Sequence, residues 1–145
     1  MALQAEFQDY WVTEEKAAEA VRRIVAIANP LQVIVFGSRA RGDHRPNSDL
    51  DLAVILETDQ PDMAGKLYAN AVRGLPMEVD LVVASKAYFD LHRPWLNSVF
   101  NYIDKEGVVV FDRSYPQSAR TEIAEPFGAG RIRSDSSAAL SLIHI

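Results

Sequence analysis

The sequence contains no cysteine among its 145 residues, so disulfide bonds and thiolate metal sites are excluded. It also contains no apolar run near the roughly 20 residues that a membrane-spanning helix needs. Its first residues, MALQAEFQDYWVTEEK, lack the basic start and apolar segment of a secretory signal. These absences lead us to expect a cytoplasmic protein that does not enter a membrane.

Positive charge is scarce as well, because 15 Lys and Arg face 20 Asp and Glu and the net charge is −5. This balance argues against a surface built mainly to hold nucleic acid, although it allows a local basic pocket. With only 3 histidines and no cysteine, a zinc site is not expected. A hydrophobic share of 48% is instead typical of a globular domain with a real core.

Hydrophobic spacing predicts a helix that begins at Thr13, which is a suitable N-cap, and stops at Pro30. Apolar runs rich in β-branched residues predict strands over 31–36, 48–56, 77–84 and 108–111. Between them we expect a turn opening a short helix at 37–42, an amphipathic helix entered at Pro61, and a helix beginning at Pro94.

The order of these elements, a helix followed by strands separated by helices, predicts a small α/β (α+β) sheet with helices packed on it. We place this domain at residues 1–113. Residues 114–145 contain many serines and show no sustained hydrophobic period. We expect them to form a loose tail whose last dozen or so residues do not belong to the natural protein. We therefore exclude residues 114–145 from the predicted fold.

Two aspartates, Asp49 and Asp51, lie in the predicted strand within NSDLDLAV. Alternation along a strand places them on one face, and Asp80 lies in the next predicted strand. If those strands are neighbours, three carboxylates converge and repel one another unless a cation lies between them. Oxygen ligands favour Mg²⁺ or Mn²⁺. The alternative is that each aspartate is a solvated residue on an open edge strand.

The turn after the first strand, GSRARG, begins with Gly37 and Ser38. A glycine there lets another backbone or a ligand approach, and amides at a helix start attract anions. Arg39, Arg41 and Arg45 add positive charge, so phosphate is the expected ligand. The turn is neither a P-loop nor a GxGxxG dinucleotide motif. Each arginine has a plain alternative as a solvated surface residue.

Taken together, Gly37-Ser38, ten further residues and Asp49-Leu50-Asp51 resemble the signature of the DNA polymerase beta-like nucleotidyltransferase superfamily. The segment GSRARGDHRPNSDLDLAV is most similar to its smallest members, the minimal nucleotidyltransferase (MNT) proteins. The third carboxylate of that family falls on Asp80. The resemblance covers about residues 13–112.

This resemblance implies a mixed sheet and a nucleotidyl transfer that uses two Mg²⁺ ions, with Mn²⁺ as an alternative, and ATP as substrate. Gly37 and Ser38 would hold the triphosphate. Asp49 and Asp51 would coordinate both metal ions, while Asp80 would bind one of them and help to deprotonate the acceptor hydroxyl. The nucleotide base itself is not encoded in these residues.

The resemblance also suggests a partner. Many MNT proteins are antitoxins of HEPN-domain RNase toxins and transfer AMP to a toxin tyrosine, and the short tail expected here leaves no acceptor domain. We therefore expect an adenylyltransferase antitoxin. Two alternatives stay open: an antitoxin that neutralises its partner by binding alone, and a homodimeric nucleotidyltransferase for small molecules of the aminoglycoside type.

Overall fold

A four-stranded mixed sheet forms the centre of the protein in a computed structural model that describes residues 10–115. The strands are β1 (Gln32–Phe36), β2 (Leu50–Leu56), β3 (Val79–Ser85) and β4 (Val108–Asp112). Their order is β3-β2-β1-β4, with β1 antiparallel to β2 and β4, and β2 parallel to β3. The predicted α/β class is confirmed, and β2 and β3 are neighbours as the carboxylate argument required.

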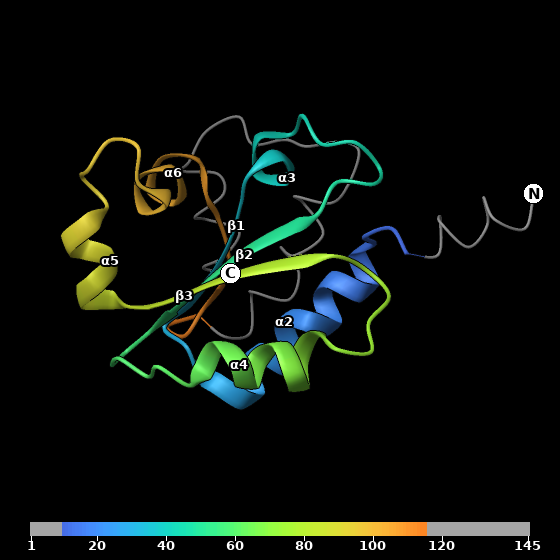
Figure 1. The fold of residues 1–145 in the computed structure, drawn as a ribbon, viewed down its shortest axis with the longest axis horizontal. Coiled ribbons are helices and arrows are strands. Elements are labelled where there is room, and N and C mark those ends of the chain that lie inside the picture. The colour runs from blue at the N-terminus through green and yellow to red at the C-terminus, as the bar shows by residue number, and fades with distance from the viewer. Residues whose placement is uncertain (1–9, 116–145) are drawn as a thin grey trace, which may run out of the picture.

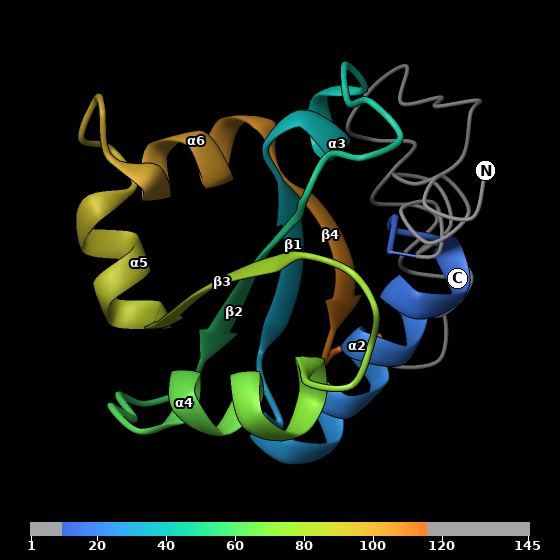
Figure 2. The ribbon, with the colours of Figure 1, turned by 45° about the vertical axis from the view of Figure 1, so that its right-hand side comes forward.

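Helices cover both faces of this sheet. They are α2 (Glu14–Ala28), α3 (Ser38–Arg41), α4 (Met63–Leu67), α5 (Lys86–His92) and α6 (Val99–Glu106). Figures 1 and 2 show α2 and α4 together on one side of the strands, and α5 and α6 on the other. None of the helices within residues 10–115 is both long and apolar enough to cross a membrane.

Helix α2 follows its prediction closely. The Thr13 hydroxyl accepts a hydrogen bond from the Lys16 backbone N–H at 3.2 Å, which caps the first turn. The helix ends at Ala28, before Pro30, because the preceding Asn29 adopts a left-handed conformation with φ 45°. A residue before proline avoids the helical region, and asparagine tolerates the left-handed one.

The sheet separates two apolar clusters, because successive strand residues point to opposite faces. The cluster under α2 and α4 is the larger, and its buried strand members include Val33, Val35, Leu52, Val54, Leu56 and Val110. The cluster under α5 and α6 contains Ile34, Phe36, Ala53, Ile55, Phe89 and Ile103. Asp51 is two residues before Ala53 and therefore lies on the α5–α6 face.

The amphipathic helix expected after Pro61 is present, but its second half is a π-helical turn, η1 (Tyr68–Val72). The Arg73 N–H donates to the Tyr68 carbonyl at 3.1 Å, which is the wider spacing of a π-turn. The turn also brings the Tyr68 hydroxyl to the Leu81 N–H, with 2.8 Å between the two atoms. The edge strand β3 thereby gains a partner for one outward N–H group.

The helix predicted to begin at Pro94 was placed wrongly, since α6 begins at Val99. Asn97 has a positive φ of 70°, which interrupts any helix that passes through it. The Ser98 hydroxyl then accepts from the Asn101 N–H at 3.2 Å and caps the true helix start. Leu96, which lies between Pro94 and the true helix start, is 73% exposed in the loop.

The predicted tail, 114–145, lies outside the described residues apart from Ser114 and Tyr115. The division of the chain into a domain of residues 1–113 and a tail stays a prediction.

Candidate active site

The turn between β1 and α3 brings Gly37 against Asp51. Gly37 has φ 76° and ψ −155°, a conformation that residues with a side chain rarely adopt. A Cβ atom built at this position would overlap the Asp51 carboxylate. Glycine is therefore required here both for its backbone conformation and for the space that it leaves to Asp51.

Asp51 and Asp80 face each other across the parallel pair of strands. Their Cα atoms are register partners in β2 and β3, and both residues lie on the α5–α6 face. The pKa of the Asp51 carboxyl is raised to about 6, first by burial and then by the negative charges of Asp80 and Asp49, while the Arg41 charge opposes the rise. The Asp80 carboxyl is close enough to hydrogen-bond to the protonated form of Asp51.

Asp49 lies one residue before β2, because the strand begins at Leu50 and not at residue 48 as predicted. Its side chain is exposed, and its charge acts on Asp51 and on the Arg39 guanidinium. In the described part of the chain, no three carboxylate or imidazole groups are arranged as a ready metal site. The fold thus joins Asp51 and Asp80 directly, and the three-carboxylate site stays a prediction.

The chemistry of this pair fits a hard divalent cation. Two carboxylates that repel each other bind such an ion favourably, because the ion removes the repulsion that burial enhances. Mg²⁺ keeps several water ligands and needs only one or two protein carboxylates. Asp51 and Asp80 would hold the ion, and Asp49 is near enough to interact with its charge.

Arg39 has a position that the sequence did not reveal. Its side chain is only 3% exposed, and its guanidinium donates to the Ser48 carbonyl at 3.0 and 3.2 Å. It also donates to the carbonyls of Pro46 at 3.2 Å and Arg45 at 3.5 Å. Burial lowers the Arg39 pKa, and the nearby Asp49 charge opposes that effect. Arg39 therefore fixes the loop that leads into Asp49; its predicted contact with a nucleotide stays a prediction.

Arg41 and Arg45 are both exposed, with different surroundings. Arg41 forms ion pairs with Asp43 at 3.2 Å and with Glu106 of α6 at 3.3 Å. Within residues 10–115, the Arg45 guanidinium has neither an ion pair nor a hydrogen bond, and the Ser38 hydroxyl has no hydrogen bond. The N–H groups of residues 40 and 41 donate to the Gly37 carbonyl and are therefore not available to an anion. An anion would instead contact the amides before residue 40 and the side chains of Ser38 and Arg45.

A hollow of about 230 Å³ adjoins the Gly37 turn. Its lining consists of Phe36, Gly37, Arg41, Val99, Tyr102 and Glu106. The last three residues belong to α6 and were missed by the sequence analysis. No spacing signal links them to the turn, because 65 positions separate Arg41 from Glu106 and only the fold joins them.

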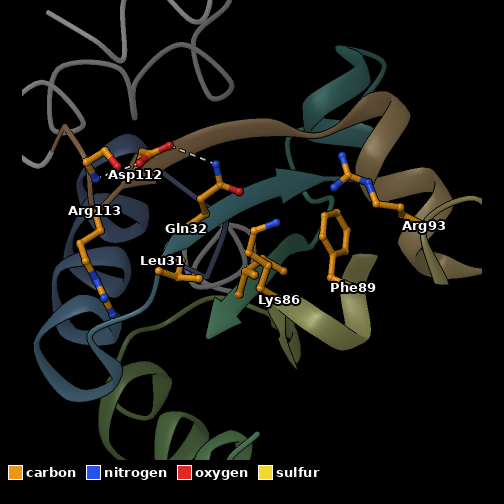
Figure 3. A pocket seen from close by; sticks show the side chains of 9 residues that line it. Leu31, Gln32, Lys86, Phe89, Arg93, Asp112 and Arg113 are labelled. Atoms are coloured by element: carbon orange, nitrogen blue, oxygen red, sulfur yellow. Dashed lines mark hydrogen bonds between the residues drawn. The ribbon is translucent and has the colours of Figure 1, made fainter. Parts of the chain in front are cut away.

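A larger hollow of about 440 Å³ lies at the other end of the sheet, near the start of β1 (Figure 3). Three cationic side chains reach it, but each is already engaged. Lys86 and Arg93 both bind Asp90 at 2.7 Å, and Arg113 binds Glu57 at 3.0 Å. This hollow lies at the opposite end of the strands from Asp51 and Asp80, so we do not assign it to the active site.

Comparison with known proteins agrees with the fold and indicates the family. The chain matches the family model of the nucleotidyltransferase domain over residues 14–105, more than half of its length. A crystal structure of a candidate nucleotidyltransferase from Sulfolobus solfataricus has the same fold, with a TM-score of 0.50 and 22% sequence identity. The match covers 79% of this chain and 90% of that one. No curated protein sequence matches. On the strength of the family match, the chain belongs to the nucleotidyltransferase domain family.

Proposed function

We propose that the protein is a Mg²⁺-dependent adenylyltransferase that moves AMP from ATP to a hydroxyl group of a second protein. The observation that carries this proposal is the carboxylate pair Asp51–Asp80, which lies on one face of the sheet beside the Gly37 turn. A partly buried carboxylate with a raised pKa next to a phosphate-type turn is a recognised mark of a catalytic centre. The family match supports nucleotidyl transfer as the general reaction.

The proposed reaction forms one bond and breaks another. The acceptor oxygen attacks the α-phosphorus of ATP, a new P–O bond forms, and the bond from that phosphorus to the β-phosphate oxygen breaks. Pyrophosphate leaves with the electron pair, and Asp80 takes the proton of the acceptor hydroxyl. Bound Mg²⁺, with Mn²⁺ as an alternative, would supply positive charge that lowers the hydroxyl pKa and stabilises the leaving pyrophosphate.

The residues of this chain divide the remaining work. Asp51 and Asp80 would hold the cations with Asp49 as the third ligand, and Gly37 and Ser38 would bind the triphosphate. Arg41 and Arg45 contribute positive charge to the phosphates from the exposed side of the turn. Arg39 keeps the loop before β2 in place through its bonds to the Ser48 carbonyl, and thereby positions Asp49.

For the acceptor we propose a tyrosine of a HEPN-domain toxin, with the protein acting as its antitoxin. This assignment rests on the resemblance of the Gly37–Asp51 segment to the MNT proteins. It is compatible with residues 10–115, which contain the sheet and its helices and no additional domain that would bind an acceptor.

The test is a transfer assay with α-labelled ATP, Mg²⁺ and a HEPN partner protein. We expect label on the partner, an added AMP in its mass spectrum, and loss of both with Asp51→Asn. Asp59→Asn, which changes an exposed loop aspartate away from the sheet, is the matched control and should leave transfer intact. Neutralisation of the toxin that survives Asp51→Asn would instead indicate an antitoxin that acts by binding.

The same assay separates the second alternative. Transfer to an aminoglycoside in the absence of any partner protein would show that the protein acts on small molecules, and a dimer in solution would then be expected to complete the acceptor site. Absence of transfer to every acceptor, together with a lack of Mg²⁺-dependent ATP binding, would overturn the proposed activity.

A further inference from the structure

The hollow next to Gly37 has an apolar floor and a charged rim. Phe36, Val99 and Tyr102 contribute the apolar part, and the Arg41–Glu106 ion pair forms the polar part. That ion pair joins α3 to α6, which lie at the same end of the sheet in both views (Figures 1 and 2). The hollow is thus bounded by the element that carries the proposed phosphate site and by a helix far along the chain.

Tyr102 is the most distinctive residue of this lining. Its side chain is 49% exposed, and within residues 10–115 its ring makes no aromatic contact and its hydroxyl no hydrogen bond. Tyr88 is equally exposed, at 50%, but its ring packs against His92 at 4.1 Å and Phe100 at 5.4 Å between centroids. The Tyr88 ring is therefore held by packing against other rings. The Tyr102 ring has no such neighbour within residues 10–115, so its face is available to a ligand.

The size of the hollow indicates what it would hold. Pockets for whole small molecules measure roughly 300–1,000 Å³. A volume of about 230 Å³ is below that range, and it suits one part of a ligand whose remainder lies elsewhere. The remainder would extend toward Gly37, which belongs both to the hollow and to the turn beside Asp51.

Arg41 shows that the hollow and the carboxylates are within reach of one ligand. Its side chain lines the hollow, and its charge also acts on the Asp51 carboxyl, whose pKa it lowers against the effects of burial and of Asp80. A nucleotide with its phosphates at Gly37 would therefore have its nucleoside end close to α6.

We propose that the hollow is the nucleobase subsite, in which the base of the bound nucleoside triphosphate stacks on the Tyr102 ring and contacts Val99. This inference rests on the proposed nucleotidyl transfer and adds the residues that hold the base. Stacking on a single tyrosine depends little on the identity of the base, because every base has a π-face. ATP and GTP should therefore both depend on Tyr102 for binding.

The test compares ATP with inorganic tripolyphosphate, which carries the phosphates without a base, in calorimetric titrations with Mg²⁺ present. Tyr102→Ala should weaken ATP binding roughly 5-fold to 150-fold, the range measured for loss of one base–aromatic stack. It should leave tripolyphosphate binding unchanged. Tyr102→Phe keeps the ring and should bind ATP as the wild type does. Tyr88→Ala, the control at matched exposure, should have no effect on either ligand.

Two results would overturn the subsite. Unchanged ATP binding by Tyr102→Ala would show that the ring does not contact the base, and equal weakening of ATP and tripolyphosphate would indicate a general distortion. Both differ from failure of the proposed function, in which the wild-type protein would bind neither ligand. Because Tyr102 is half exposed, the alanine variant should fold, and circular dichroism verifies this before titration.

Discussion

The Asp51 carboxylate occupies the space into which a side chain at Gly37 would project. Asp51 lies in β2 and is the register partner of Phe36, the last residue of the antiparallel neighbour β1. Gly37 begins the turn that follows β1. A turn proposed to bind phosphate and a carboxylate proposed to bind metal thus depend on each other for space. Substitution at the glycine should disturb both at once.

Gly37→Ala should lower the free energy of unfolding by roughly 1–3 kcal/mol, because alanine is strained at positive φ and its Cβ collides with Asp51. ATP binding should be lost as well. Gly65→Ala is the matched control, since a Cβ there meets nothing within 4 Å and φ is not positive. That helical position should tolerate or gain from alanine. Urea unfolding measures both variants, and equal stability of the two would contradict the argument.

Asp51 should make stability depend on pH in metal-free buffer. Its pKa of about 6 in the folded protein lies above the ordinary value of 3.8, so the folded chain binds more protons between these values. Stability should therefore fall as the pH rises from 3.8 to about 6 and then level off. The stabilising contribution of Asp51 is fully present below pH 3.8 and is lost above about pH 6.

Asp51→Asn removes this titration. At neutral pH the variant should be more stable than the wild type by roughly 1–2 kcal/mol, a figure reduced for solvent screening of a partly exposed group. The difference should vanish in acid, where Asp51 is protonated in both states. Denaturant unfolding across the pH range measures it, with Asp59→Asn as the exposed control. A constant difference at every pH would show that Asp51 does not titrate as described.

Mg²⁺ should stabilise the folded protein, because it binds the carboxylate pair and the unfolded chain has no such pair. In thermal melts, adding Mg²⁺ should raise the Tm of the wild type, and chelation should reverse the rise. Asp51→Ala should abolish the Mg²⁺-dependent shift. A shift of equal size in that variant would place the cation elsewhere.

Removing the buried guanidinium should destabilise the protein more than removing an exposed one. Arg39→Ala leaves the carbonyls of Ser48 and Pro46 without their donor, and we expect a loss of roughly 2–4 kcal/mol. Arg45→Ala changes an exposed side chain without partners in residues 10–115 and should alter stability by less than about 0.5 kcal/mol. Equal losses would refute a loop-holding role for Arg39.

The sequence predicted what depends on local pattern. Hydrophobic period and β-branched runs located α2 and all four strands, since each signal lies within the element that it describes. The alternation of strand residues also placed Asp51 and Asp80 on a common face once β2 and β3 were paired. The helix start near Pro94 was missed because the left-handed Asn97 breaks an apolar spacing that continues through it.

Features that depend on tertiary contacts were not predictable. Arg39 and Arg45 are chemically identical, and only the folded loop makes one buried and the other exposed. Nothing in the sequence indicates that Tyr102 lies beside Gly37, because the whole sheet determines how closely α6 approaches α3. The types of the secondary-structure elements could therefore be predicted from the sequence, whereas the roles of these side chains could be assigned only from the fold.

The π-helical turn at Tyr68 has a consequence for self-association. β3 is an outer strand, and its unpaired amides would otherwise offer a template for a strand from another molecule. Because the Tyr68 phenol already accepts the Leu81 N–H, an incoming chain would have to displace the ring before it could extend the sheet. The turn thus protects this border of the protein against aggregation by strand addition.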